Sequence, residues 1–115
     1  MQHFPPSPDF YCEIRPDGDR VVVDVAGEFD FGVAPQVAAS VDELLDAGVA
    51  RVVIDLRRLS FLDSSGVHTL IAAHDAAERR GATLLVVRGQ ANVHRVLTLT
   101  ATDTLFTFED DLARA

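Results

Sequence analysis

The sequence contains no lysine and no tryptophan, and its ten basic residues are all arginines. Asp and Glu together number 18, so the net charge is −8, and arginines are adjacent only at positions 57–58 and 79–80. A protein that binds nucleic acid or an anionic membrane presents a basic patch to the phosphates. The composition therefore argues against both of these partners and favours a protein partner with a basic or polar face.

Cysteine occurs once, at Cys12, so no intrachain disulfide can form, and a reducing compartment is the simpler expectation. We interpret Cys12 as a small buried residue of a strand rather than a reactive thiol. Long apolar runs are also missing: none approaches the roughly 18 residues that span a bilayer. The first eight residues are polar and proline-rich, unlike a signal peptide. These absences predict a cytoplasmic protein.

The length of 115 residues and the apolar content of 48% suit one domain with a single core. Three prolines at positions 5, 6 and 8 indicate a loose arm over residues 1–9. No internal repeat or linker follows. We therefore expect a flexible arm at 1–9 and one folded domain at 10–115.

Within that domain, apolar and polar residues alternate over 10–14, and a turn signal at 15–19 precedes an apolar stretch at 20–26. This pattern predicts an antiparallel hairpin. The remaining expected elements are a helix from Pro35 that Gly48 ends, a strand at 51–56, a helix at 67–80 that Gly81 ends, a strand at 83–87, a short helix at 93–97 and a strand at 105–108. The tail at 109–115 is compatible with a further short helix.

Strands that alternate with helices predict parallel pairing with right-handed crossovers. We expect one α/β domain with a mixed, mostly parallel sheet of four to five strands, an N-terminal antiparallel hairpin, and three to four helices. The β-branched run at 51–56 is typical of a strand covered on both faces.

Three kinds of chemistry find little support. The histidines are scattered, and His68 and His74 point about 240° apart on a helix, so no metal site is expected. The Gly-x-Ser-x-Gly frame of a serine hydrolase is absent. The common phosphate-binding glycine loops are absent as well, although a helix N-terminus can bind anions without them, so weak nucleotide binding stays open. We predict a protein that is not an enzyme and has no cofactor.

The stretch from Ser60 to Gly66 is the most informative part of the chain. It places two hydroxyls, Ser64 and Ser65, beside a glycine between a buried strand and a helix. One interpretation makes Ser64 or Ser65 the helix N-cap. The other makes a serine the acceptor of a phosphate, which would meet unpaired backbone N–H groups and the positive end of the helix dipole. Helical spacing alone favours the cap, whereas Asp63 and two serines are more polarity than a cap requires, so both interpretations stay open here.

The sequence resembles the STAS-domain family, and within it the stand-alone anti-sigma factor antagonists. The segments that carry the resemblance are Gly27–Asp30, Val52–Leu56, Leu59–Gly66, Arg79–Ala82 and Val93–Leu97. The Asp-Ser-Ser-Gly motif at 63–66, after a Val-Ile-Asp-Leu strand, is the most specific of these. The family often has Thr-Gly-Leu after its third helix, whereas this chain has Thr100-Ala101-Thr102 and so lacks the expected glycine.

The resemblance implies a partner-switching cycle in transcription regulation. The unphosphorylated protein would bind an anti-sigma factor that is also a serine kinase and so free a sigma factor. That kinase would then phosphorylate Ser64, and a serine phosphatase would restore the binding form. Asp30, Asp63, Ser65 and Gly66 would contribute to the partner surface. The alternative within the family is a STAS subunit of a transporter or signalling scaffold that is never phosphorylated.

Overall fold

The computed structural model describes residues 9–110 and 112. Its strands are β1 (Phe10–Asp17), β2 (Arg20–Phe29), β3 (Arg51–Leu62), β4 (Thr83–Val87) and β5 (Thr107–Glu109). Its helices are α1 (Ala34–Asp46), α2 (Ser64–Arg79) and α3 (Ala91–Leu99), with a 3-10 helix, η1, at Asp103–Leu105. The expected arm at 1–9 lies outside the described residues except for Asp9. The short helix considered for the tail at 109–115 likewise falls mostly on residues outside the described ones.

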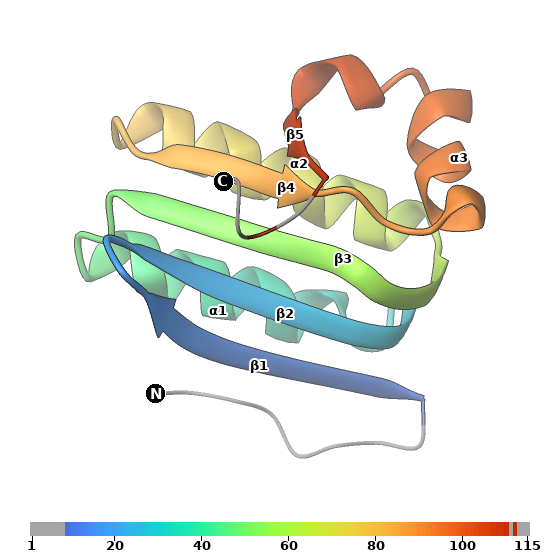
Figure 1. Ribbon diagram of the computed structural model, residues 1–115, viewed down its shortest axis with the longest axis horizontal. Helices are drawn as coiled ribbons and strands as arrows, with labels where there is room; N and C mark the ends of the chain where they lie inside the picture. Colours follow the sequence, from blue (N-terminus) through green and yellow to red (C-terminus); the bar gives the residue numbers. More distant parts are fainter. Residues whose placement is uncertain (1–8, 111, 113–115) are drawn as a thin grey trace.

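The five strands form one sheet in the order in which they occur along the chain (Figure 1). Strands β1 and β2 pair antiparallel, and all other neighbours pair parallel. This confirms the predicted mixed sheet with an N-terminal hairpin. Because the strand order never reverses, successive right-handed crossovers fall on the same side of the sheet.

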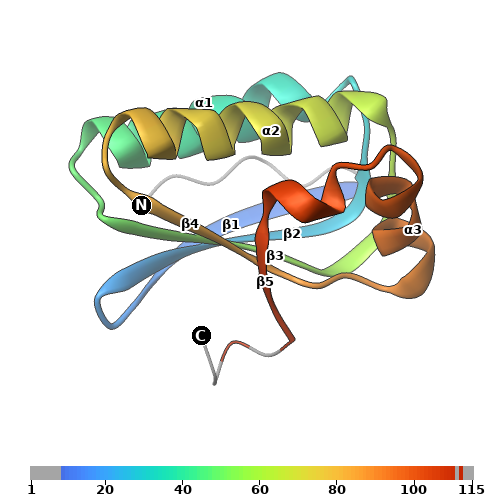
Figure 2. The ribbon, with the colours of Figure 1, turned by 90° about the horizontal axis from the view of Figure 1, so that it is seen from above.

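Helices α1 and α2 accordingly lie together on one face of the sheet, as Figure 2 shows, and α3 lies beside one end of it. The prediction that the strand at 51–56 is covered by helices on both faces is therefore wrong. Its β-branched run has another cause. On the helix side Val52 and Ile54 join the main core, and on the far side Val53 joins a second, smaller apolar cluster.

The main core lies between the sheet and the two helices. It gathers buried apolar side chains from every strand except β5 and from all three α-helices, among them Cys12, Val23, Ile54, Leu70 and Leu97. Cys12 is 0% exposed, which confirms the interpretation of this residue as a core side chain. Burial raises the pKa of its thiol to about 11, with a smaller contribution from the negative charge of Asp24.

Several element boundaries differ from those predicted. Strand β3 continues to Leu62, because irregularities in its pairing with β2 carry the ladder past Leu56 to the pair Phe29 and Leu62. The segment 105–108 is not one strand: Leu105 ends η1, and β5 begins only at Thr107. Helix α2 begins at Ser64, three residues earlier than predicted. Among the described helices none is long and apolar enough to cross a bilayer.

Candidate functional site

The candidate site lies where β2 and β3 end. These strands are parallel neighbours, and their last residues, Phe29 and Leu62, are paired in the ladder. The loop that begins with Asp30 and the Asp63-Ser64-Ser65-Gly66 motif therefore leave the sheet side by side. The backbone N–H of Asp63 donates to the carbonyl of Phe29 at 3.2 Å, which joins the two segments directly.

Asp63 is the N-cap of α2. Its Oδ1 accepts hydrogen bonds from the backbone N–H groups of Ser65 at 2.9 Å and Gly66 at 3.1 Å. The sequence interpretations that gave the cap to Ser64 or Ser65 are wrong, because an aspartate one position earlier holds the extended conformation of a cap. Ser64 is instead the first helical residue.

The same cap changes the electrostatics expected of the helix N-terminus. The backbone N–H groups of Ser65 and Gly66 are not free to bind an external anion, because the Asp63 carboxylate already accepts from both. That carboxylate also places a negative charge at the positive end of the helix dipole. A phosphate on Ser64 would therefore lie beside an occupied anion position rather than an empty one.

The second oxygen of Asp63 reaches the neighbouring loop. Its Oδ2 accepts from the backbone N–H of Phe31 at 3.3 Å. In that loop Asp30 accepts from Gly32 through its own Oδ1 at 2.9 Å, and its carbonyl accepts from the N–H groups of Val33 and Ala34. The structure thus brings Asp30 and the 63–66 motif together, and hydrogen bonds to the two aspartates hold both loops.

The four residues of the motif differ in accessibility. Ser64 is exposed, Asp63 and Ser65 are half-buried, and Gly66 is buried. The backbone of Ser65 is used on both sides: its N–H donates to Asp63, and its carbonyl accepts from the hydroxyl of Thr69 at 2.9 Å. Of the two serines, Ser64 offers the more accessible hydroxyl.

Gly66 allows α2 to approach the ends of the two strands. A Cβ at this position would lie 2.4 Å from Cδ1 of Leu62 and 3.2 Å from Cδ1 of Phe29. Both neighbours are buried, so neither can move away easily. The glycine therefore sets how closely the start of α2, with Ser64 and Ser65, packs against the ends of the two strands.

Sequence reasoning missed an aromatic residue of this site. Phe31 is 77% exposed and follows Asp30. It stands alone between Asp30 and Gly32, outside any periodic apolar pattern, which was the available signal. Phe61 is also exposed, but it pairs with Glu28 and lies on the face of β3 opposite the buried Leu62. Exposed aromatic side chains beside a polar centre are typical of a protein interface.

The described residues offer little for small-molecule chemistry. No group of three His, Cys, Asp or Glu side chains among them could hold a metal ion. A cavity of about 40 Å³ between α1 and α2, lined by Val41, Thr69 and Ala73 among others, is far smaller than a typical ligand pocket.

Comparison with known proteins gives a consistent result. The family model described as the STAS domain matches residues 11–115. A STAS-domain containing protein of Pseudomonas aeruginosa is 30% identical over 90 residues, which are 78% of this chain and 88% of that protein. An anti-sigma F factor antagonist of Paenibacillus polymyxa is 27% identical over 78 residues, or 67% of each chain.

A solved structure is also similar. The crystal structure of an anti-sigma factor antagonist from Mycobacterium paratuberculosis superimposes with a TM-score of 0.82 at 25% identity. The alignment covers 94% of this chain and 92% of that one. The fold and the element order that place the Ser64 site are therefore shared with a solved antagonist.

Proposed function

Because this chain belongs to the STAS domain family, we propose that it is an anti-sigma factor antagonist controlled by phosphorylation of Ser64. In its unphosphorylated form it binds an anti-sigma factor that has serine kinase activity, and a sigma factor is released. The kinase phosphorylates Ser64 and ends the binding, and a serine phosphatase reverses the modification. The protein itself is a binding module and catalyses nothing. The name of the Paenibacillus relative supports this proposal.

The observation that carries the proposal is the position of Ser64. Its side chain is exposed at the first turn of α2, between two loops that hydrogen bonds to Asp30 and Asp63 hold in place. A kinase can reach this hydroxyl without unfolding the domain, because Ser64 caps nothing and belongs to no core. Ser65, half-buried and tied through both backbone groups, is the poorer acceptor.

The occupied cap explains how a phosphate would act. Phosphorylation adds about −1.5 to −2 charges at neutral pH. At Ser64 these charges meet the carboxylate of Asp63, which already accepts from the N–H groups of Ser65 and Gly66. The phosphate is thus repelled locally and stays at the surface, while the fold is retained. A partner surface packed closely around Ser64 then loses its fit.

Phe31 gives this surface an apolar component. A partner that covers it gains from the removal of exposed aromatic area from water, and it comes close to Asp63, because the Phe31 N–H donates to the Asp63 carboxylate. A loss of roughly 3 kcal/mol on phosphorylation corresponds to about a hundredfold loss of affinity. Asp30 and Asp63 hold the loops at that contact, and Gly66, which is buried, sets the turn.

The test combines phosphorylation with binding. The protein is incubated with the cognate kinase and ATP, and the site of the phosphate is located by peptide mass analysis. We expect phosphate on Ser64 in the wild type and in Ser65→Ala, and none in Ser64→Ala. In a parallel pull-down, Ser64→Asp should retain far less kinase than the wild type.

The opposite results would point to the unphosphorylated subunit of a transporter or scaffold. That protein would bind its membrane complex equally well as wild type and as Ser64→Asp, and the kinase would leave it unmodified. Phosphate on Ser65 rather than Ser64 would retain the switch but overturn the assignment of the acceptor.

A further inference from the structure

The face of the sheet opposite α1 and α2 carries its own apolar cluster. Its members come from three adjacent strands and are at most 7% exposed: Val22, Val53, Leu85 and Val87. No helix of the described chain covers this face (Figure 2). The residue that packs against the cluster is Leu112, beyond the last strand.

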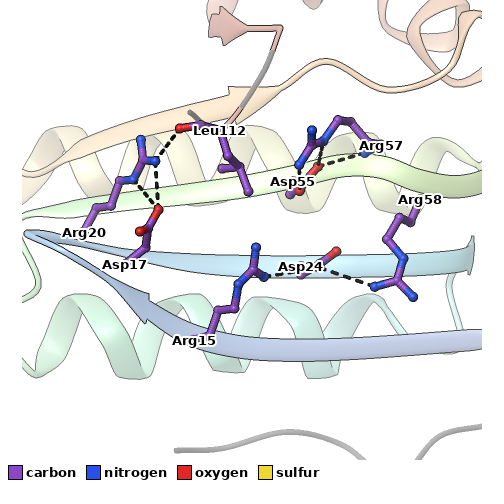
Figure 3. Close-up of polar contacts among 8 residues, drawn as sticks. All are labelled: Arg15, Asp17, Arg20, Asp24, Asp55, Arg57, Arg58 and Leu112. Carbon is purple, nitrogen blue, oxygen red and sulfur yellow. Dashed lines mark hydrogen bonds and ion pairs between the residues drawn. The ribbon is translucent and has the colours of Figure 1, made fainter. Parts of the chain in front are cut away.

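Arginines lie on two of the strands that carry this cluster, β2 and β3, and on the neighbouring β1 (Figure 3). Arg15 and Arg58 both reach one oxygen of Asp24, at 3.3 and 3.5 Å, and Arg57 makes a two-pronged contact with Asp55 at 3.1 and 3.0 Å. In each pair the guanidinium is the outer partner. The arginine side chains are 39%, 60% and 42% exposed, whereas those of Asp24 and Asp55 are 9% and 2% exposed. The face therefore presents guanidinium groups above buried carboxylates.

Two residues that follow β5, Asp110 and Leu112, make contacts like those of a bound ligand. The Leu112 side chain contacts the apolar cluster, and the Leu112 carbonyl accepts from Nη2 of Arg20. Two residues earlier, Asp110 accepts from Nε of Arg88 at 3.1 Å. Asp110 thus binds an arginine while Leu112 packs on the apolar cluster, as an acidic and an aliphatic residue of a bound peptide would.

Arg20 lacks one acceptor in this arrangement. Its side chain is 9% exposed, and Asp17 accepts from its Nε and Nη2. Its Nη1 is buried and has no acceptor among the described residues. A buried N–H without a partner costs free energy, so a ligand that brings an additional oxygen gains from it. A carboxylate has a second oxygen that could accept from Nη1, whereas the Leu112 carbonyl accepts from Nη2 alone.

We propose that this sheet face is a second interaction surface, which binds an acidic segment of a partner protein that inserts an aliphatic side chain. The residues Glu109, Asp110 and Leu112 occupy the surface in the free protein as a tethered competitor. Few contacts hold them, since β5 has only three residues and Asp110 is exposed. The surface does not include Ser64, and the proposal does not depend on the switch.

The test uses a fluorescent peptide with the sequence of residues 108–115, Phe-Glu-Asp-Asp-Leu-Ala-Arg-Ala, added to the full chain. Removal of the competitor in Leu112→Ser should tighten peptide binding by about tenfold or more, because the binding-competent fraction rises. Asp110→Arg, which opposes Arg88 at an exposed position, should tighten it by a smaller factor. Leu105→Ser changes an exposed leucine outside this face and should match the wild type.

Two further arms locate the site. The backbone amides of Val22, Val53, Leu85 and Val87 should shift in the NMR spectrum on titration, and those of Ser64 and Ser65 should not. A peptide whose Glu and Asp residues are replaced by Gln and Asn should bind at least several-fold more weakly. Three results would overturn the proposal. The first is equal peptide binding by the wild type, Leu112→Ser and Asp110→Arg. The others are no binding at millimolar peptide, and NMR shifts confined to other residues.

Discussion

At the scale of single residues, Asp63 links two parts of the site. One carboxylate oxygen caps α2, and the other accepts from Phe31 in the neighbouring loop. Its charge also occupies the helix N-terminus that a phosphate on Ser64 would otherwise use. Cap and charge are separable by substitution, because asparagine caps a helix about as well as aspartate does.

We therefore predict that Asp63→Ala lowers the free energy of unfolding by about 0.5–2 kcal/mol, as the loss of an N-cap does. Asp63→Asn keeps the capping oxygen but loses the acceptor of the Phe31 N–H, so it should lose less stability than Asp63→Ala. Urea denaturation followed by circular dichroism measures both. An equal loss in the two variants would mean that the charge or the hydrogen bond to Phe31, and not the cap, provides the stability.

Ala101 occupies a position that usually belongs to glycine. Helices α1 and α2 are followed, one residue after the C-cap, by Gly48 and Gly81, with φ of 86° and 71°. At the same position after α3 stands Ala101, with φ of 57°. The N–H groups of Ala101 and Thr102 donate to the carbonyls of Thr98 and Leu97, so the complete capping motif forms without the glycine.

Ala101→Gly should raise the free energy of unfolding by roughly 0.5–1 kcal/mol. The left-handed conformation costs alanine about 1–2 kcal/mol, and the greater freedom of glycine in the unfolded chain returns part of the gain. Ala47→Gly is the matched control, because Ala47 ends α1 with a right-handed φ of −77° and should lose stability. A thermal melt of the two variants shows whether the signs are opposite.

At the scale of elements, the position of α2 above the sheet depends on a short contact. The missing side chain of Gly66 lets the helix start directly over Leu62 and Phe29. Helix propensity alone would favour alanine here by about 1 kcal/mol. The packing acts in the opposite direction, since the two buried neighbours lie within 3.2 Å of any added Cβ.

Gly66→Ala should therefore destabilise the domain by a net 1–2 kcal/mol or so, because overpacking outweighs propensity. Gly32→Ala serves as control: its Cβ would meet only the Oδ1 tip of Asp30 at 3.2 Å, so a smaller loss is expected. Chemical denaturation provides both values. A stabilised Gly66→Ala variant would show that the helix can shift without cost.

At the scale of the whole molecule, the pH dependence of stability reflects how three strands share buried charge. Asp24 on β2 lies opposite Asp55 on β3, between Arg15 of β1 and Arg58 of β3. Burial raises the pKa of Asp24 above its ordinary value of 3.8, and the charge of Asp55 raises it further, while the two arginines lower it. The folded state therefore holds this proton more tightly than the unfolded state does.

The sign of the effect follows from that difference. As pH rises above about 4, the unfolded chain loses the Asp24 proton first, so this group makes the free energy of unfolding fall until the raised pKa is passed. Asp24→Asn should remove that fall and so raise the free energy of unfolding at pH 7 relative to the wild type. Asp55→Asn, which loses the two-pronged contact with Arg57, should destabilise instead. Urea denaturation between pH 4.5 and 8 tests both signs.

Local patterns in the sequence were sufficient for the order of elements and for the position of the site. Alternation at 10–14, helical spacing after Pro35 and the turn residues before Arg20 depend on neighbours along the chain, so the hairpin, the α/β class and the Asp-Ser-Ser-Gly motif could be predicted. Glycines at 48 and 81 ended the helices for the same local reason.

Contacts between distant residues decided what those patterns could not. Which residue caps α2, how far β3 runs and which face the helices cover depend on the pairing of Phe29 with Leu62 and on a strand order that never reverses. Asp63 could accept from both Ser65 and Phe31 only once those segments were neighbours. Propensity acts within a few residues, whereas hydrogen bonds and close packing act wherever the fold brings two atoms together, so only the tertiary structure could settle these points.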